Sequence, residues 1–151
     1  FRSKGSDFDV EVFVHDGAGA RPVGDGATVR PGDRIGFRLH VARPSHVWIV
    51  GLDAAGEVYR CYPQAPGVGP VLVPGAAAPI DVPEFVEFDA TPGAERIVAL
   101  SCPQPVAFEV LAASLRAAGV SRPNARALPP LLAGCSQRET RLRKAAAGAR
   151  P

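Results

Sequence analysis

The three histidines, His15, His40 and His46, are the side chains of this sequence best suited to acid–base or metal chemistry. Neutral imidazoles are common ligands of zinc, manganese and iron, and a bound metal can activate water for hydrolysis. None of these histidines forms the i, i+4 pair on a helix that is typical of such a site. We therefore interpret them as neutral surface residues. A metallohydrolase that uses His40 or His46 ranks last among our hypotheses.

Motifs for a nucleophile or for phosphate binding are missing from the sequence. No serine stands in a GxSxG motif, and the stretch DGAGARPVGDG lacks the Gly-Lys-Ser/Thr ending of a P-loop. Close carboxylate pairs such as Asp7 with Asp9, or Asp81 with Glu84, could hold calcium. A solvated strand face explains these pairs better. The sequence thus predicts no catalytic residue, no metal site and no cofactor.

The cysteines are Cys61, Cys102 and Cys135, and their spacing matches no zinc motif. Cys102 closes a predicted strand and Cys135 opens the last one, so the two bracket the only predicted helix. In an oxidising compartment, a Cys102–Cys135 disulfide would join that helix to the sheet. Cys61 lies within a predicted strand, where a cysteine usually behaves as a small buried hydrophobic residue.

Aromatic side chains on neighbouring predicted strands are the best candidates for contact with a ligand. If Trp48 and Tyr59 shared a face, they would form a ligand platform, although a core position is the better interpretation of Trp48. Tyr62 precedes Pro63 and a loop that begins at Gln64, and the loops of a β-sandwich commonly carry its binding sites. The candidate partner-binding residues are therefore Tyr59, Tyr62 and Gln64.

Short strands and tight turns dominate the elements that must position these residues. Residues 35–41 alternate between apolar and polar side chains, the pattern of a half-buried strand. Residues 47–52 form a continuous apolar run, which is typical of a central strand covered on both faces. Turn signals every roughly 8–12 residues favour a sandwich or barrel. Further strands are expected at residues 8–14, 27–30, 58–62, 71–73, 80–82, 85–88 and 95–101, and a polar, glycine-rich loop at residues 15–26.

The pattern changes after Cys102. Apolar residues at helical spacing predict one helix over about residues 106–118, with Gly119 as its C-cap, packed on the edge or end of the sandwich. Residues 137–144 are expected to form a last, charged edge strand. We divide the chain into a linker end at residues 1–6, a single β-sandwich domain at 7–144 and a disordered tail at 145–151.

Composition is that of an ordinary globular domain. The chain has 151 residues, of which 46% are hydrophobic, and this is enough for one real core. Residues 1–96 carry 9 Lys and Arg against 13 Asp and Glu, whereas residues 97–151 carry 8 against 2. This basic end is too short and too mixed in sign to predict nucleic-acid binding.

No apolar run approaches the roughly 18 residues of a membrane span. The chain begins with Phe1 and has no methionine, so we expect a piece of a longer or processed protein. Contact with a membrane is then expected only through a segment missing from this chain.

The order of these motifs, over nearly the whole chain, resembles a bacterial domain-of-unknown-function family. The family pattern is a PGD turn, two strands, a D-x-x-G loop, a strand ending in Tyr-Pro and a D-x-x-G-x-E strand entry. Members occur after a membrane helix, in proteins whose N-terminal part resembles a zinc-binding anti-sigma factor, and also beside kinase or caspase-like modules and in lipoproteins. The matching residues are Pro31-Gly32-Asp33, Asp53 with Gly56, Tyr62-Pro63 and, shifted by one position, Asp89, Gly93 and Glu95.

The resemblance implies an immunoglobulin-like antiparallel β-sandwich without catalytic residues. It also implies an extracytoplasmic (periplasmic) binding or sensory module of a membrane-anchored envelope or regulatory protein, whose partner is a protein or a cell-envelope ligand. A structural module that assembles by edge-strand pairing is the second hypothesis. The alternative is a partner-binding domain located in the cytoplasm. The sequence leaves the oligomeric state open.

Overall fold

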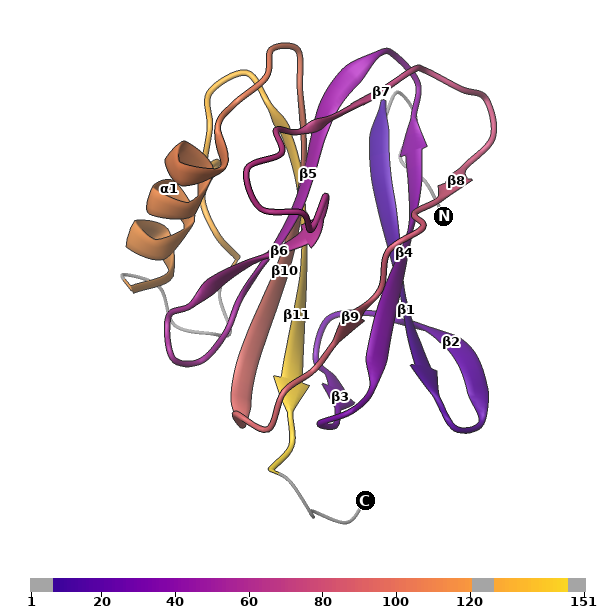
Figure 1. Ribbon diagram of the computed structural model, residues 1–151, viewed down its shortest axis with the longest axis vertical. Helices are drawn as coiled ribbons and strands as arrows, with labels where there is room; N and C mark the ends of the chain where they lie inside the picture. Colours follow the sequence, from indigo (N-terminus) through magenta and orange to yellow (C-terminus); the bar gives the residue numbers. More distant parts are fainter. Residues whose placement is uncertain (1–6, 121–126, 147–151) are drawn as a thin grey trace.

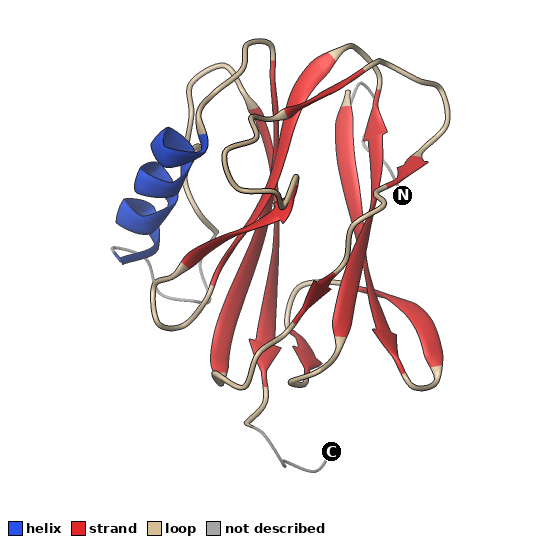
Figure 2. Ribbon diagram, viewed as in Figure 1, coloured by secondary structure: helices blue, strands red, loops and turns tan. Residues whose placement is uncertain are grey.

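Two β-sheets pack face to face, and one helix covers the outer face of the second sheet (Figure 1). The computed structural model describes residues 7–120 and 127–146. Many more residues lie in strands than in the helix in this part of the chain (Figure 2). The structure confirms the predicted fold class, a mainly β sandwich with a single helix near its C-terminal end.

The first sheet has the strand order β2-β1-β4-β8, and β9 also pairs with β4. All its pairs are antiparallel. Its strands are β1 (Phe8–Asp16), β2 (Gly19–Val23), β4 (Arg34–Val41), β8 (Ile80–Asp81) and β9 (Val86–Glu87).

The second sheet has the order β3-β11-β10-β5-β6, and β7 also pairs with β5. Its pairs are antiparallel except that β3 runs parallel to β11. Its strands are β3 (Ala27–Val29), β5 (Ser45–Leu52), β6 (Val58–Tyr62), β7 (Val71–Val73), β10 (Gly93–Cys102) and β11 (Ser136–Lys144).

Strands β5 and β10 are buried on both faces because each contributes to two hydrophobic clusters. Val47 and Ile49 on β5, and Ile97 on β10, face the first sheet. Their sequence neighbours, such as Trp48 and Val98, face the helix. The continuous apolar runs of these strands are therefore explained by a three-layer arrangement.

The helix α1 (Phe108–Val120) packs on the outer face of the second sheet, not on the edge or end of the sandwich as the sequence predicted. It begins two residues later than expected and includes Gly119, which is therefore not its C-cap. A Cβ atom at position 119 would come within 2.4 Å of Leu52 Cδ2. Glycine thus allows the last turn of α1 to approach β5 closely.

Three predictions about strands need correction. The stretch 15–26 is not a single loop, because β2 forms a hairpin with β1 and its polar side chains face solvent. Strand β11 is not the edge of its sheet along its whole length, because β3 pairs with Leu142 to Lys144. The strands predicted at 80–82 and 85–88 are both shorter, at two residues each.

One backbone hydrogen bond lies just beyond the predicted end of the domain at residue 144. Ala145 donates a backbone hydrogen bond to Val29, 2.9 Å long, so pairing continues one residue past the predicted end of the domain. The predicted linker end at 1–6 and residues 147–151 of the predicted tail lie outside the described residues.

Candidate functional site

Four polar side chains meet at the end of the sandwich where β10 begins and β11 ends. We call the buried Glu95 and Lys144, together with the half-buried Tyr59 and the exposed Asp89 that contact them, the buried polar network. The Lys144 ammonium contacts Glu95 Oε1 at 2.7 Å and forms a second ion pair with Asp89. The Tyr59 hydroxyl donates to Glu95 Oε2 at 2.7 Å. Glu95 and Lys144 are each only 2–3% exposed, so their charges depend on one another.

Small residues and strand register place this network. Tyr59 lies opposite Gly51 on the neighbouring strand, and a Cβ atom at position 51 would come within 2.2 Å of the Tyr59 ring. The ring therefore covers Gly51, which directs its hydroxyl towards Glu95. Leu142 is the cross-strand partner of Glu95, and the side chain of Lys144, two residues further along β11, lies on the same face.

The electrostatics of the network keep the lysine charged and the tyrosine neutral. Burial acts to lower the pKa of Lys144, but hydrogen bonds to Asp89 and Glu95 outweigh it, and the pKa lies above its ordinary value. Burial raises the pKa of Tyr59 far above its ordinary value, and nearby negative groups add to the effect. The hydrogen bond from Lys144 lowers the pKa of Asp89, whereas burial raises the pKa of Glu95.

The sequence did not predict this network as a unit. Glu95 and Lys144 carry charges, but they occupy positions that alternate in phase with the buried Ile97 and Leu142. A charged residue in phase with apolar neighbours is the signal that could have pointed to a buried ion pair. Two such residues on neighbouring strands strengthen that signal.

A second cluster joins the start of α1 to the outer face of the sheet. The Trp48 indole N–H donates to the backbone carbonyl of Val106 at 2.8 Å. The Arg60 guanidinium lies 5.0 Å from the centre of the Trp48 ring and 4.4 Å from that of Phe108. Trp48 is thus a core residue, as the sequence favoured. Trp48 faces the helix and Tyr59 the other sheet, so the two cannot form one ligand platform.

Tyr62 and Gln64 stand at the start of a segment that crosses from the second sheet to the first (Figure 1). We call residues 63–85 the crossing segment. Tyr62 is half-buried and packs against the inter-sheet cluster. The Gln64 backbone N–H donates to Glu84 Oε2 at 2.9 Å, and its side-chain amide donates to the Phe85 carbonyl at 2.6 Å. Gln64 therefore ties the two ends of the crossing segment together.

The crossing segment carries most of the exposed large apolar side chains among the described residues. Phe85 packs over Gly36, with its ring edge-on to His15 at 4.8 Å between centres, and still leaves almost half its surface exposed. Among the described residues, five large hydrophobic side chains are exposed, and one of them, Val110, lies on α1. The other four lie on the crossing segment: Val68, Leu72, Ile80 and Phe85.

A disulfide joins Cys102 and Cys135, the pair that the sequence predicted. Cys102 is the last residue of β10, and Cys135 directly precedes β11. The bond therefore closes the base of the long connection that contains α1. Cys61 is a free, fully buried thiol whose pKa is strongly raised by burial, as expected of a small core residue.

The histidines are dispersed, and they are less exposed than the sequence predicted. His15 and His40 lie on two strands of the first sheet and His46 on β5 of the second. His40 is only 8% exposed. Within residues 7–120 and 127–146, no three or more His, Cys, Asp or Glu side chains are grouped so that they could hold a metal ion.

Comparisons with protein families, with curated proteins and with solved structures find no match for this chain. The resemblance to a domain-of-unknown-function family therefore stays a prediction. No helix in the described part of the chain is long and apolar enough to cross a membrane.

Proposed function

We propose that this domain is a non-enzymatic, extracytoplasmic binding or sensory module of a membrane-anchored envelope or regulatory protein. The observation that carries the proposal is the crossing segment, which holds four exposed apolar side chains and is tied at its ends by Gln64. Large apolar side chains that form one contiguous exposed surface commonly mark a contact with another protein, and the proposal takes these four to act together in this way. The expected partner is accordingly a protein of the cell envelope.

The state of the buried polar network supports a non-enzymatic role. A nucleophilic or basic lysine needs a lowered pKa, whereas the pKa of Lys144 is raised by its two carboxylate partners. The Tyr59 phenol is likewise held neutral and committed to Glu95. These groups stabilise the end of the sandwich, which leaves recognition to the surface.

The disulfide supports an extracytoplasmic location. Disulfides persist in oxidising compartments and are rare in the cytosol. Here the Cys102–Cys135 bond fastens the connection that carries a whole layer of the fold, so its presence matters to the structure. The bond therefore supports a location outside the cytoplasm, and the periplasm is the compartment that we propose.

Assembly by edge-strand pairing has less support. Four of the strands at the sheet margins, β3, β7, β8 and β9, have only two or three residues each. Strand β2 is longer but contains Pro22, which lacks a backbone donor. Short strands and proline are typical means of preventing edge-to-edge pairing.

Photo-crosslinking in cells tests the proposal. A photoreactive amino acid in place of Val68, in the full-length protein, should yield one discrete adduct with an envelope protein, and Leu72→Ser should weaken that adduct several-fold. The same label in place of Ala55, on the exposed β5–β6 hairpin, serves as the control. Equal adducts from positions 55 and 68, or none from position 68, would contradict the proposal.

A further inference from the structure

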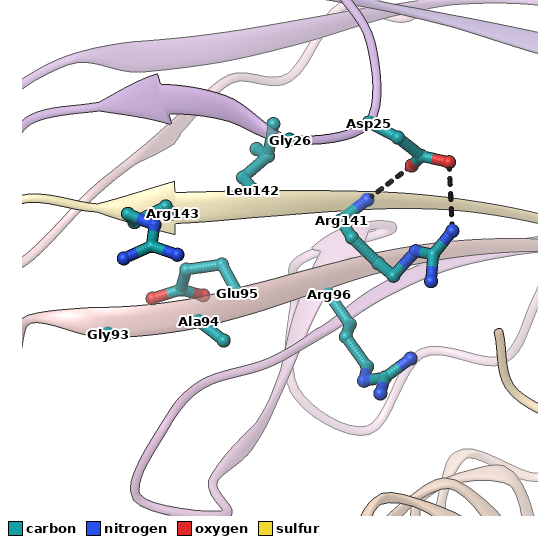
Figure 3. Close-up of a pocket in the computed structure, with 9 residues that line it drawn as sticks. All are labelled: Asp25, Gly26, Gly93, Ala94, Glu95, Arg96, Arg141, Leu142 and Arg143. Carbon is teal, nitrogen blue, oxygen red and sulfur yellow. Dashed lines mark hydrogen bonds and ion pairs between the residues drawn. The ribbon is translucent and has the colours of Figure 1, made fainter. Parts of the chain in front are cut away.

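A hollow lined by arginines lies at the opposite margin of the second sheet from the crossing segment, where β3, β11 and β10 run side by side (Figure 3). Its volume is about 600 Å³, and ligand pockets typically measure roughly 300–1,000 Å³. Small residues from the start of β10 and from the loop before β3 contribute to its lining: Gly26, Gly93 and Ala94. We call this site the basic hollow.

Three arginines surround the basic hollow because of strand register. Arg141 and Arg143 alternate on one face of β11, and Arg96 is the cross-strand partner of Arg141. Like charges directly opposite on a sheet are destabilising. The partner of Arg143 is Ala94, whose small side chain leaves space beside the guanidinium.

Two of the three arginines have carboxylate partners. Arg96 is almost fully buried and forms an ion pair with Glu139. Arg141 contacts Asp25 Oδ2 at 3.3 Å, and Figure 3 shows Arg143 extending away from that pair. Arg143 is exposed and forms no ion pair among the described residues.

A smaller hollow of about 280 Å³ adjoins the first and shares Ala94 and Arg96 with it. This second hollow adds Arg116, an exposed residue of α1 that likewise has no ion pair within the described part of the chain. The carboxylate of Glu95, which also lines the basic hollow, is already held by Lys144 and Tyr59. Asp53 also lines the second hollow, and its Oδ1 accepts the backbone N–H groups of Ala55 and Glu57. Arg116 and Arg143 are thus the lining arginines without an ion pair among the described residues.

We propose that the basic hollow binds a phosphate group, with Arg143 as its principal contact. The planar guanidinium fork matches the oxygens of a phosphate and can donate two parallel hydrogen bonds to them. A phosphate monoester, with close to two negative charges at neutral pH, suits a cluster of arginines better than a single carboxylate does. This site is separate from the crossing segment and adds a second class of ligand to the proposed function.

Isothermal titration with inorganic phosphate at constant ionic strength tests this inference on the whole domain. Arg143→Gln should weaken phosphate binding about tenfold or more, since a charge-assisted hydrogen bond is lost. Arg43→Gln is the matched control, because Arg43 is an exposed arginine on the β4–β5 turn with only a loose ion pair to Asp7. Crosslinking from position 68 should be unchanged by Arg143→Gln, so the two proposals fail separately.

Vesicles identify the source of the phosphate. Binding to vesicles that contain phosphatidic acid, a phosphate monoester, but not to phosphatidylcholine vesicles, would assign a lipid headgroup, whereas binding of inorganic phosphate alone would assign a free solute. Either result supports the inference if Arg143→Gln weakens that binding about tenfold or more. The inference is overturned if neither inorganic phosphate nor the vesicles that contain phosphatidic acid bind, or if Arg143→Gln and Arg43→Gln weaken binding equally.

Discussion

At the scale of single residues, the buried polar network links stability to a few hydrogen bonds. Glu95 accepts one from Tyr59 and one from Lys144, and little water reaches these groups. Removing one partner leaves a buried carboxylate less well satisfied, which costs more than an ordinary hydrogen bond is worth. The network should therefore respond strongly to the loss of a single atom.

Tyr59→Phe tests this sensitivity. The variant removes only the hydroxyl that donates to Glu95, so the free energy of unfolding should fall by about 2 kcal/mol. Urea denaturation followed by Trp48 fluorescence measures it. Tyr62→Phe is the control, because the Tyr62 hydroxyl has no hydrogen-bond partner among the described residues, and its change should stay within about 0.5 kcal/mol. Equal effects of the two variants would refute a specific role for Tyr59.

The raised pKa values of Lys144 and Tyr59 predict a loss of stability at alkaline pH. Their ordinary values are 10.5 and 10.0, and both lie higher in the folded chain. As the pH rises past about 10, the unfolded chain loses these protons first and binds fewer than the folded chain, so the free energy of unfolding falls. The urea midpoint of the wild type should fall between pH 8 and 11. The midpoint of Tyr59→Phe should fall less steeply over the same range. Identical slopes for both proteins would contradict the assignment.

The sequence could predict some of these residue roles. Trp48 lies within an apolar run and Cys61 within a predicted strand, so the sequence predicts both in the core, and both are buried. The roles of Tyr59 and Gln64 depend on residues 36 and 20–21 positions away, which no local pattern connects to them. Strand register and the path of the crossing segment decide these contacts, and both are tertiary properties.

At the scale of elements, α1 is the part of the fold most dependent on a few contacts. Leu111 and Leu115 are fully buried against the second sheet, and Trp48 donates a hydrogen bond to the carbonyl of Val106, two residues before α1. The return segment before β11 is held by side chains: Ser114 donates to the Leu131 carbonyl, and Gln137 accepts from the Leu131 N–H. The disulfide closes the base of this whole connection.

Removing the disulfide should loosen this layer. Cys102→Ser with Cys135→Ser opens a connection whose ends are 33 residues apart, and chain-entropy estimates then give a loss of about 4 kcal/mol in the free energy of unfolding. Denaturant titration with Trp48 fluorescence reports both stability and the docking of α1. Reductant added to the double variant serves as the control and should change nothing further. Unchanged stability in the double variant would show that the bond is dispensable.

Gly119→Ala tests the close approach of α1 to β5. In an exposed helix this change stabilises by about 1 kcal/mol, but here the new methyl group would meet Leu52 within 2.4 Å. We expect a loss of about 1 kcal/mol or more, measured by thermal and urea unfolding. In a Leu52→Ala background the loss should disappear, which makes a double-mutant cycle. Stabilisation by Gly119→Ala in the wild-type background would contradict the packing.

The position of the helix shows how far element prediction could go. Helical spacing predicted its existence to within two residues at each end, because periodicity is a local signal. Its place on the sheet was predicted wrongly, although the apolar runs of β5 and β10 already required a cover on both faces. The hairpin of β2 was missed because all its side chains except Val23 are exposed and give no apolar pattern.

At the scale of the whole molecule, the two margins of the second sheet offer different chemistry. The crossing segment extends from the β6 side with apolar side chains, and the basic hollow lies on the β3 side with arginines. The sequence has an acidic first part and a basic last part, which indicates an uneven distribution of charge. It does not show where on the folded surface the positive charge lies. Folding brings Arg96 of β10 beside Arg141 of β11, which concentrates the charge in one place.

The central claim is that this domain lies outside the cytoplasm, and the redox state of its cysteines in cells tests that claim most directly. Thiols are alkylated in intact cells that make the full-length protein, and the protein is then denatured and analysed by mass spectrometry with and without reduction. We predict one free thiol, at Cys61, with Cys102 and Cys135 labelled only after reduction. Three free thiols without reduction would contradict the extracytoplasmic location and would favour a location in the cytoplasm.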